Sequence, residues 1–424
     1  MHTLQEIGTF VGLRGAAISL RSVGNLVSQL SGIERTSMQA MILALQRLAR
    51  GRIGNPNFTG SRVRGVFFFA GNWKFGPPQQ AVFHPFYGAT FIPENASLFT
   101  LHPRDPAHLG WSESKIKRIF ALDSIQQSGA NTVIMSYWGE PSSDRWRFWA
   151  PMQTATGAHD ELFDEAVGRP LLIMPAIESA AAAGNSNSYF FSQDFPGTPE
   201  SPAPALVAQV NDLVNRYLIN PKDPKYADHW LQLFDRNGVA RYAINLLHVA
   251  SAQLASNADS VFAAGFDRVA DLVFEQTGVR VGFTLDVLVD GDTYVAIPES
   301  AGSWLEKTDA VLAIQGFIPE IASDGHEFGF KLDYWRTWLA TGIPVFFDVS
   351  PGYNTKVFKR DPYGDNLEWR DGLSSAWSDS FTGIVFNAWN GYTEGFAAMP
   401  TVEHEDTDWN WIQQLFDQVR NTPA

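Results

Sequence analysis

The chain has 424 residues, of which 45% are hydrophobic and 18% charged, a composition that gives a globular protein with one large core or two modest ones. It contains no cysteine, which excludes disulfides, thiolate nucleophiles and cysteine-bound zinc, and no apolar run reaches the roughly 18 residues that a membrane-spanning helix needs. The formal net charge of −14 repels nucleic acid and other polyanions at long range, which favours neutral substrates over phosphate-rich or uronate-rich ones.

The first 62 residues are basic, unlike the rest of the chain, and are predicted to form a helical extension. They hold seven arginines and two acidic residues. Apolar residues recur at helical spacing from Met38 to Leu48, and the stretch from Gly51 to Gly60 interrupts the pattern. We expect a helical cap or a partner-binding segment through which copies of the chain form a homo-oligomer. A cleaved targeting segment is the alternative, so the sequence does not determine the cellular compartment.

From Val63 onward, runs typical of buried strands alternate with helix-like stretches. Eight strands are predicted, at 66–70, 132–137, 171–177, 242–247, 281–285, 310–314, 345–347 and 384–386. Helices are predicted at 113–127, 203–218, 260–277, 328–341, 373–377 and 409–419. This alternation predicts an α/β fold, a (β/α)8 TIM barrel over residues 63–424, preceded by the helical extension at 1–62. A doubly wound open sheet is the alternative, but the first strand lacks the glycine-rich turn that such a sheet uses to bind nucleotides.

The ends of the predicted strands carry the groups from which a site can be built. In a parallel barrel, side chains just past the C-terminal strand ends meet at one mouth. Glu178, Asp286 and Asp348 follow the third, fifth and seventh strands. Glu178 would be buried without a partner unless it faced the mouth, whereas Asp286 and Asp348 could equally bond backbone amides or cap the next helix. The same strand ends bring further residues that we expect to bind substrate: Trp73, Tyr137, Trp138, His248 and Tyr353.

No metal site and no cofactor are predicted. His248 stands alone, without a second histidine at the spacing that a zinc site requires. We therefore expect His248 to be a hydrogen-bonded residue of the core or to bind a substrate hydroxyl.

The last predicted strand runs directly into a stretch rich in polar and aromatic side chains. Trp389, Asn390, Tyr392 and Glu394 follow the apolar run within a few residues. Flat aromatic faces stack on sugar C–H groups, amides bind hydroxyls, and partial desolvation raises the pKa of a carboxylic acid, so this combination suits a sugar site. The alternative is an ordinary Asn-Gly turn with the two aromatic residues packed inward.

The same stretch resembles a motif of known glycoside hydrolases. Trp389-Asn390-Gly391-Tyr392-Thr393-Glu394-Gly395 is similar to the Trp-Asn-Glu-Trp-His-Glu-Gly or Trp-Asn-Asp-Tyr-Gly-Glu motif that follows the last strand in the family 99 endo-α-mannosidases and the family 71 α-1,3-glucanases. Three upstream islands resemble mannosidase strand ends: Ser136-Tyr137-Trp138-Gly139, Ile177-Glu178 and the segment from Val349 to Asn354. The resemblance covers most of the barrel in short islands and implies a (β/α)8 glycosidase that acts on carbohydrate. It also implies that Glu394 is the general acid.

The sequence departs from this pattern at Gly391. By the resemblance, the families carry their second catalytic carboxylate at that position. Glycoside hydrolysis ordinarily needs two carboxylates, so another residue would have to supply the second one. The hypothesis is a glycosidase of oligo- or polysaccharide in which Glu394 donates the proton and Asp286 or Glu178 activates water or stabilises the transition state, with Trp73, Trp138 and Trp389 stacking on sugars. The alternatives are a carbohydrate-binding barrel without catalysis and another barrel hydrolase, such as a metal-dependent one.

Overall fold

The structure is a computed structural model. It describes residues 62–70, 82–84, 89–91, 101, 103–105, 114–137, 157–178, 200–250, 261–288, 308–315, 335–336, 338–340, 342–351, 367–391 and 396–421. The N-terminal extension up to residue 61 lies outside the described residues. Its helices, and the division into segments 1–62 and 63–424, therefore stay predictions.

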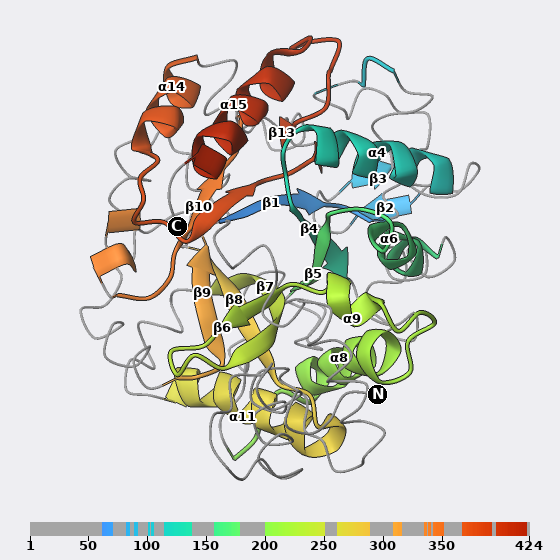
Figure 1. Ribbon diagram of the computed structural model, residues 1–424, viewed down its shortest axis with the longest axis vertical. Helices are drawn as coiled ribbons and strands as arrows, with labels where there is room; N and C mark the ends of the chain where they lie inside the picture. The colour runs from blue at the N-terminus through green and yellow to red at the C-terminus, as the bar shows by residue number, and fades with distance from the viewer. Residues whose placement is uncertain are drawn as a thin grey trace, which may run out of the picture.

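Eight parallel strands form a nearly closed barrel, as the sequence predicts (Figure 1). They hydrogen-bond in the order β10-β11-β1-β4-β5-β7-β8-β9. A parallel bridge between Ile314 and Val345, with Ile314 N donating to Pro344 O at 2.9 Å, joins β9 to β10, so that the ring is nearly closed. The strands are β1 (Val63–Phe68), β4 (Thr132–Tyr137), β5 (Leu172–Glu178), β7 (Ala240–Ala250), β8 (Val281–Leu288), β9 (Val311–Gln315), β10 (Phe346–Val349) and β11 (Gly383–Phe386).

Helices surround the strands on the outside (Figure 1). The predicted helices are present as α4 (Lys115–Gln127), α8 (Pro204–Val214), α11 (Val261–Thr277), α14 (Leu367–Ala376) and α15 (Thr407–Asn421), and helical residues at 335–336 and 338–340 fall within the predicted 328–341. A π-helical turn, η2 (Asn215–Ile219), continues α8. Within the described part of the chain, none of the helices has the length and apolar character needed to cross a membrane.

Several short elements are absent from the sequence-based prediction. They are the helices α6 (Ala158–Ala166) and α9 (Tyr226–His229), the strand β6 (Gln232–Phe234) that pairs antiparallel with β7, and the hairpins β2 (Val82–His84) with β3 (Ala89–Phe91) and β12 (Asn390–Gly391) with β13 (Phe396–Ala397). The second hairpin follows β11 directly, so it lies at the C-terminal end of the barrel, where a mouth is expected.

Aromatic packing shows which face of β8 and of β10 points outward. Phe347 of β10 packs against three aromatic residues outside the barrel, Trp335 and, between α14 and β11, Trp377 and Phe381, with ring centroids 4.4 to 5.7 Å apart. On β8, Phe283 packs against Phe266 of α11 at 5.7 Å. Because successive strand residues point to opposite faces, the neighbours of these two phenylalanines point into the barrel.

Strand β1 begins three residues before the predicted 66–70. The prediction began late because a charged residue, Arg64, interrupts the apolar run. Arg64 lies within β1, and its Nε donates to Gly129 O at 2.7 Å while its Nη1 donates to Arg62 O at 3.2 Å. These bonds satisfy the guanidinium outside the barrel interior. An arginine is therefore compatible with a strand that is otherwise apolar on both faces.

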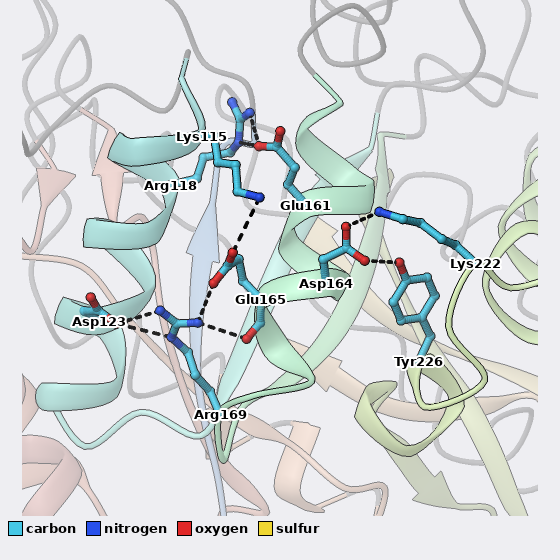
Figure 2. A network of polar contacts seen from close by, with 9 residues as sticks. All are labelled: Lys115, Arg118, Asp123, Glu161, Asp164, Glu165, Arg169, Lys222 and Tyr226. Atoms are coloured by element: carbon cyan, nitrogen blue, oxygen red, sulfur yellow. Dashed lines mark hydrogen bonds and ion pairs between the residues drawn. The ribbon is translucent and has the colours of Figure 1, made fainter.

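The helices beside β4 and β5 are joined by a network of charged side chains (Figure 2). Arg169 lies between α4 and α6, where it contacts Asp123 at 2.7 Å and Glu165 at 2.8 Å. Arg118, which is buried, pairs with Glu161 between the same two helices. The network fixes how α4 and α6 pack over the strands.

Candidate functional site

Two predicted carboxylates lie on the inner face of the barrel near the C-terminal strand ends. Asp348 follows the outward-facing Phe347 on β10, and Asp286 lies at an inward-facing position of β8, in register with Gln315 of β9. Both carboxylates are buried, with Asp286 at 0% and Asp348 at 1% exposure. β8, β9 and β10 are neighbours around the barrel, so the structure brings these two acids to one side of the mouth.

Asp348 has a partner on the next strand. Asn387, directly after β11, donates from Nδ2 to Asp348 Oδ2. Its backbone N donates to Val349 O at 2.8 Å, which extends the pairing of β10 and β11 by one residue. Asn387 is 1% exposed, and among the residues that the structure describes its Oδ1 has no hydrogen-bond partner. An amide at this position therefore holds one oxygen of the carboxylate and presents an acceptor of its own.

A second polar group lies deeper in the barrel interior. Asn245 of β7 donates to Thr284 Oγ1 on β8 at 2.9 Å, and Thr284 contacts Met174 Sδ of β5 at 3.7 Å. Strands β5 and β8 are not neighbours, so the last contact crosses the interior. Thr284 lies two residues before Asp286, which places this group one layer below the mouth.

The residues after β11 fasten the mouth to β1. Phe69 N donates to Asn390 Oδ1 at 3.0 Å, and Asn390 Nδ2 donates to Phe69 O at 3.2 Å. Trp389 N donates to Phe67 O at 2.7 Å, and its ring packs edge-on against Trp409 of α15. The side-chain amide of Asn390 thus bonds to the backbone through both its oxygen and its nitrogen. The Trp389 side chain is fully buried. These contacts hold Trp389 and Asn390 against β1 and α15. The predicted roles of these two residues in sugar binding stay predictions.

Tyr137 points away from the barrel interior. Its hydroxyl donates to Asp212 Oδ2 on α8 at 2.6 Å, and its ring lies 5.1 Å from that of His159 on α6. The side chain is 1% exposed. A tyrosine held in this way ties the end of β4 to the helical layer, and its predicted contact with substrate stays a prediction.

The remaining predicted residues are only partly described. Glu178 is the last residue of β5 and His248 lies near the end of β7, so both backbones are at the C-terminal side of the barrel, but their side chains lie outside the described residues. Four aromatic residues and the predicted acid also fall outside them: Trp73, Trp138, Tyr353, Tyr392 and Glu394. Gly391 belongs to β12, so Glu394 falls in the segment that joins β12 to β13.

His159 supports the end of β4 and was not predicted from the sequence. It is fully buried in the first turn of α6, with Nε2 3.0 Å from Ser136 O, so this nitrogen carries the proton and donates. Burial, helped by the charges of Arg216 and Arg118, lowers the pKa of His159 to about 4, although the bond to Ser136 opposes the shift. The ring is therefore neutral in the folded protein at neutral pH.

The low pKa of His159 predicts that the folded protein loses stability in acid. The unfolded chain gains a proton at His159 as the pH falls below 6.5, whereas the folded protein gains it only near pH 4. The folded state therefore loses up to about 3 kcal/mol as the pH falls through this window. Urea unfolding of wild type and His159→Gln at pH 7 and pH 4.5 measures the effect. We expect the variant to lose about 2 to 3 kcal/mol less between the two pH values, and an unchanged pH dependence would contradict the assignment.

Comparisons with known proteins identify the fold. No family model and no curated protein matches this sequence. The structure is similar to the GH99 endo-α-mannosidase from Bacteroides thetaiotaomicron, with a TM-score of 0.51 and 14% identity over 84% of this chain and 97% of the other. An endo-1,4-β-mannanase from Rhizomucor miehei matches 76% of this chain and 96% of its own, with a TM-score of 0.47 and 8% identity.

A family 5 glycoside hydrolase, a mannosidase from the same fungus, matches 84% of this chain and 93% of its own, with a TM-score of 0.44 and 10% identity. At these identities, the likeness concerns the fold. The chain is a (β/α)8 barrel with the architecture of the GH99 endo-α-mannosidase.

Proposed function

We propose that this barrel is a glycoside hydrolase that cleaves oligo- or polysaccharide by carboxylate acid–base catalysis. The observation that carries the proposal is the placement of Asp286 and Asp348 on the inner face at the C-terminal ends of β8 and β10, the two strands on either side of β9. Catalytic groups of TIM barrels lie at these ends, and glycoside hydrolysis needs a pair of carboxyl groups. The shared fold and the resemblance of the segment from Trp389 to Gly395 to a family motif give further support.

In this proposal, Glu394 protonates the leaving glycosidic oxygen. Asp286 or Glu178 activates water or stabilises the oxocarbenium-like transition state, which replaces the carboxylate that the families carry at the position of Gly391. Asp348, His248 and the aromatic residues at the strand ends bind the sugar. Trp389 and Asn390 hold the chain just before the segment that contains Glu394, through their bonds to the backbone of Phe67 and Phe69.

Incubation with a panel of α- and β-linked glucans and mannans, followed by detection of released reducing ends, tests the proposal. We expect wild type to release products from at least one substrate and Asp286→Asn to be slower on it. The resemblance, which implies that Gly391 stands in place of a family carboxylate, favours a second candidate, a barrel that binds carbohydrate without cleaving it. Binding without any product from pH 4 to 9 would establish that candidate. Activity abolished by a chelator and restored by a metal ion would instead indicate a metal-dependent hydrolase.

A further inference from the structure

The sequence contains two Asn-Gly pairs, and both lie at hairpins. Asn237-Gly238 lies in the turn between β6 and β7, and Asn390-Gly391 forms β12. In such a pair, the backbone nitrogen of glycine can attack the side-chain amide of the preceding asparagine, because glycine has no Cβ that would hinder the approach. The two pairs share this chemistry, so the fold decides which of them can react.

The turn at Asn237 is held together through its backbone. Gly238 N donates to Asp235 O at 2.9 Å, and Asp235 Oδ1 accepts from the backbone nitrogens of Asn237 and Val239, each at 2.9 Å. Gly238 has a φ of 74°, a left-handed conformation that glycine adopts without steric cost and that is usual at the end of a short hairpin loop. None of these bonds uses the side-chain amide of Asn237.

The side-chain amide of Asn237 is accessible to solvent. Asn237 and Gly238 are both exposed, and the amide takes part in no hydrogen bond with any residue that the structure describes. The bond from Gly238 N to Asp235 O has to open before the nitrogen can attack. This bond closes an exposed turn, and the opening of such a turn costs much less free energy than the opening of the core. The turn therefore slows the attack without preventing it.

The side-chain amide of Asn390, by contrast, is held by the fold. Its Oδ1 accepts from Phe69 N at 3.0 Å, and its Nδ2 donates to Phe69 O at 3.2 Å. Asn390 is 1% exposed, and Gly391 is buried where it pairs with Phe396 of β13. Reaction at Asn390 therefore requires that both bonds to Phe69 break and that the segment leave its buried position, which needs a larger local unfolding.

We propose that Asn237 is a site of spontaneous deamidation in the folded protein, whereas Asn390 is protected. Gly238 N gives up its proton to hydroxide and forms a bond to Asn237 Cγ, and the bond from Cγ to Nδ2 breaks. Nδ2 takes up a proton and leaves as ammonia. Water then opens the cyclic imide at one of its two carbonyl groups, which leaves aspartate or isoaspartate at position 237. The reaction consumes only water, and the proposal does not depend on the proposed glycosidase function.

The test follows deamidation at both sites by peptide mass spectrometry, after incubation of the full chain at pH 8 and 37 °C. Each site is measured in the folded protein and in the protein unfolded with guanidinium chloride, and the ratio of the two rates gives the protection that the fold provides. We expect protection of at most about tenfold at Asn237 and of at least about a hundredfold at Asn390, because only Asn390 needs a buried segment to unfold first.

Asn237→Gln is the matched control variant. It keeps an amide at the exposed position, but attack by the backbone nitrogen would form a larger ring, which closes more slowly. We expect no mass change at position 237 in this variant and an unchanged rate at Asn390. Wild type should also contain isoaspartate at position 237, detected by enzymatic methylation, because only the opening of the imide gives that product.

Two kinds of result would overturn the proposal. If Asn237 is protected as strongly as Asn390 in the folded protein, then the turn prevents the attack. If position 237 gains aspartate without isoaspartate, or if Asn237→Gln reacts as fast as wild type, then water hydrolyses the amide directly and Gly238 is not the nucleophile. Neither result bears on the glycosidase proposal, which the glycan panel tests separately.

Discussion

Replacement of Glu394 by glutamine should lower kcat for hydrolysis of a natural glycan by about 10²- to 10⁴-fold, the contribution usual for a positioned general acid. Glutamine has nearly the same shape but carries no proton to give to the leaving oxygen. The loss should therefore appear in kcat rather than in binding, because the uncharged amide still hydrogen-bonds a sugar hydroxyl. Steady-state kinetics on the substrate found in the glycan panel measures it.

The leaving group distinguishes an acid from a merely structural residue. An aryl glycoside with a strongly acidic phenol as leaving group needs no proton, so Glu394→Gln should cleave it at a rate within about tenfold of wild type. Glu403→Gln, an exposed acid in the charged run before α15, serves as the control and should match wild type on both substrates. Equal losses on the natural and the activated substrate would remove Glu394 from the role of acid.

Replacement of Asp408 by asparagine should destabilise the fold by about 3 to 5 kcal/mol, because it leaves a buried cation without its counter-ion. Asp408 lies in the first turn of α15 and pairs with Arg370 of α14 at 2.6 Å, with side-chain exposures of 2% and 5%. His404 Nδ1 lies 2.7 Å from the other carboxylate oxygen. α15 also packs on β11, where Trp411 contacts Phe386, so a loosened α15 weakens the support of the strand that leads into the mouth.

Asp406 offers a control two residues away. It pairs with Arg104 at 2.6 Å, but both side chains are about half exposed, at 49% and 50%. An exposed pair of this kind contributes at most about 1 kcal/mol, so Asp406→Asn should be nearly neutral. Free energies of unfolding from urea denaturation, compared at equal m-values, separate the two variants. A difference smaller than about 1 kcal/mol between them would show that the buried pair is not needed for stability.

The barrel could be predicted from the sequence because its strands are short apolar runs separated by helical patterns. β4 was predicted at its exact bounds, 132–137, since Asn131 precedes the run and Gly139 interrupts the pattern soon after it. β1 was predicted three residues late because Arg64 looks incompatible with a buried strand, and only the bonds to Gly129 and Arg62 make it compatible. α6 was missed because its nine residues contain four acids, three of which pair with residues far away in the sequence: Arg118 on α4, Arg216 in η2 and Lys222 after it.

The site was harder to predict than the fold, and the reason is physical. Barrel strands are buried on both faces, so hydrophobicity does not show which residues point inward. Tyr137 was therefore assigned to the mouth, although its hydroxyl is bonded to Asp212 in the helical layer. Asn387 and Asn245 could have been noticed, because a polar residue within or directly after an apolar run is expensive to bury without a partner. Their partners, Asp348 and Thr284, follow only from the register of the strands.

The central claim is that acids distant in the sequence meet at one rim with the spacing that glycoside hydrolysis requires. An experimental structure of the mouth tests it most directly, through the distance from the Glu394 carboxyl carbon to those of Glu178, Asp286 and Asp348. We predict that at least one lies about 5 to 9.5 Å from Glu394, the range of retaining and inverting enzymes. Separations beyond about 10 Å to all three, with Glu394 directed away from the barrel axis, would contradict it.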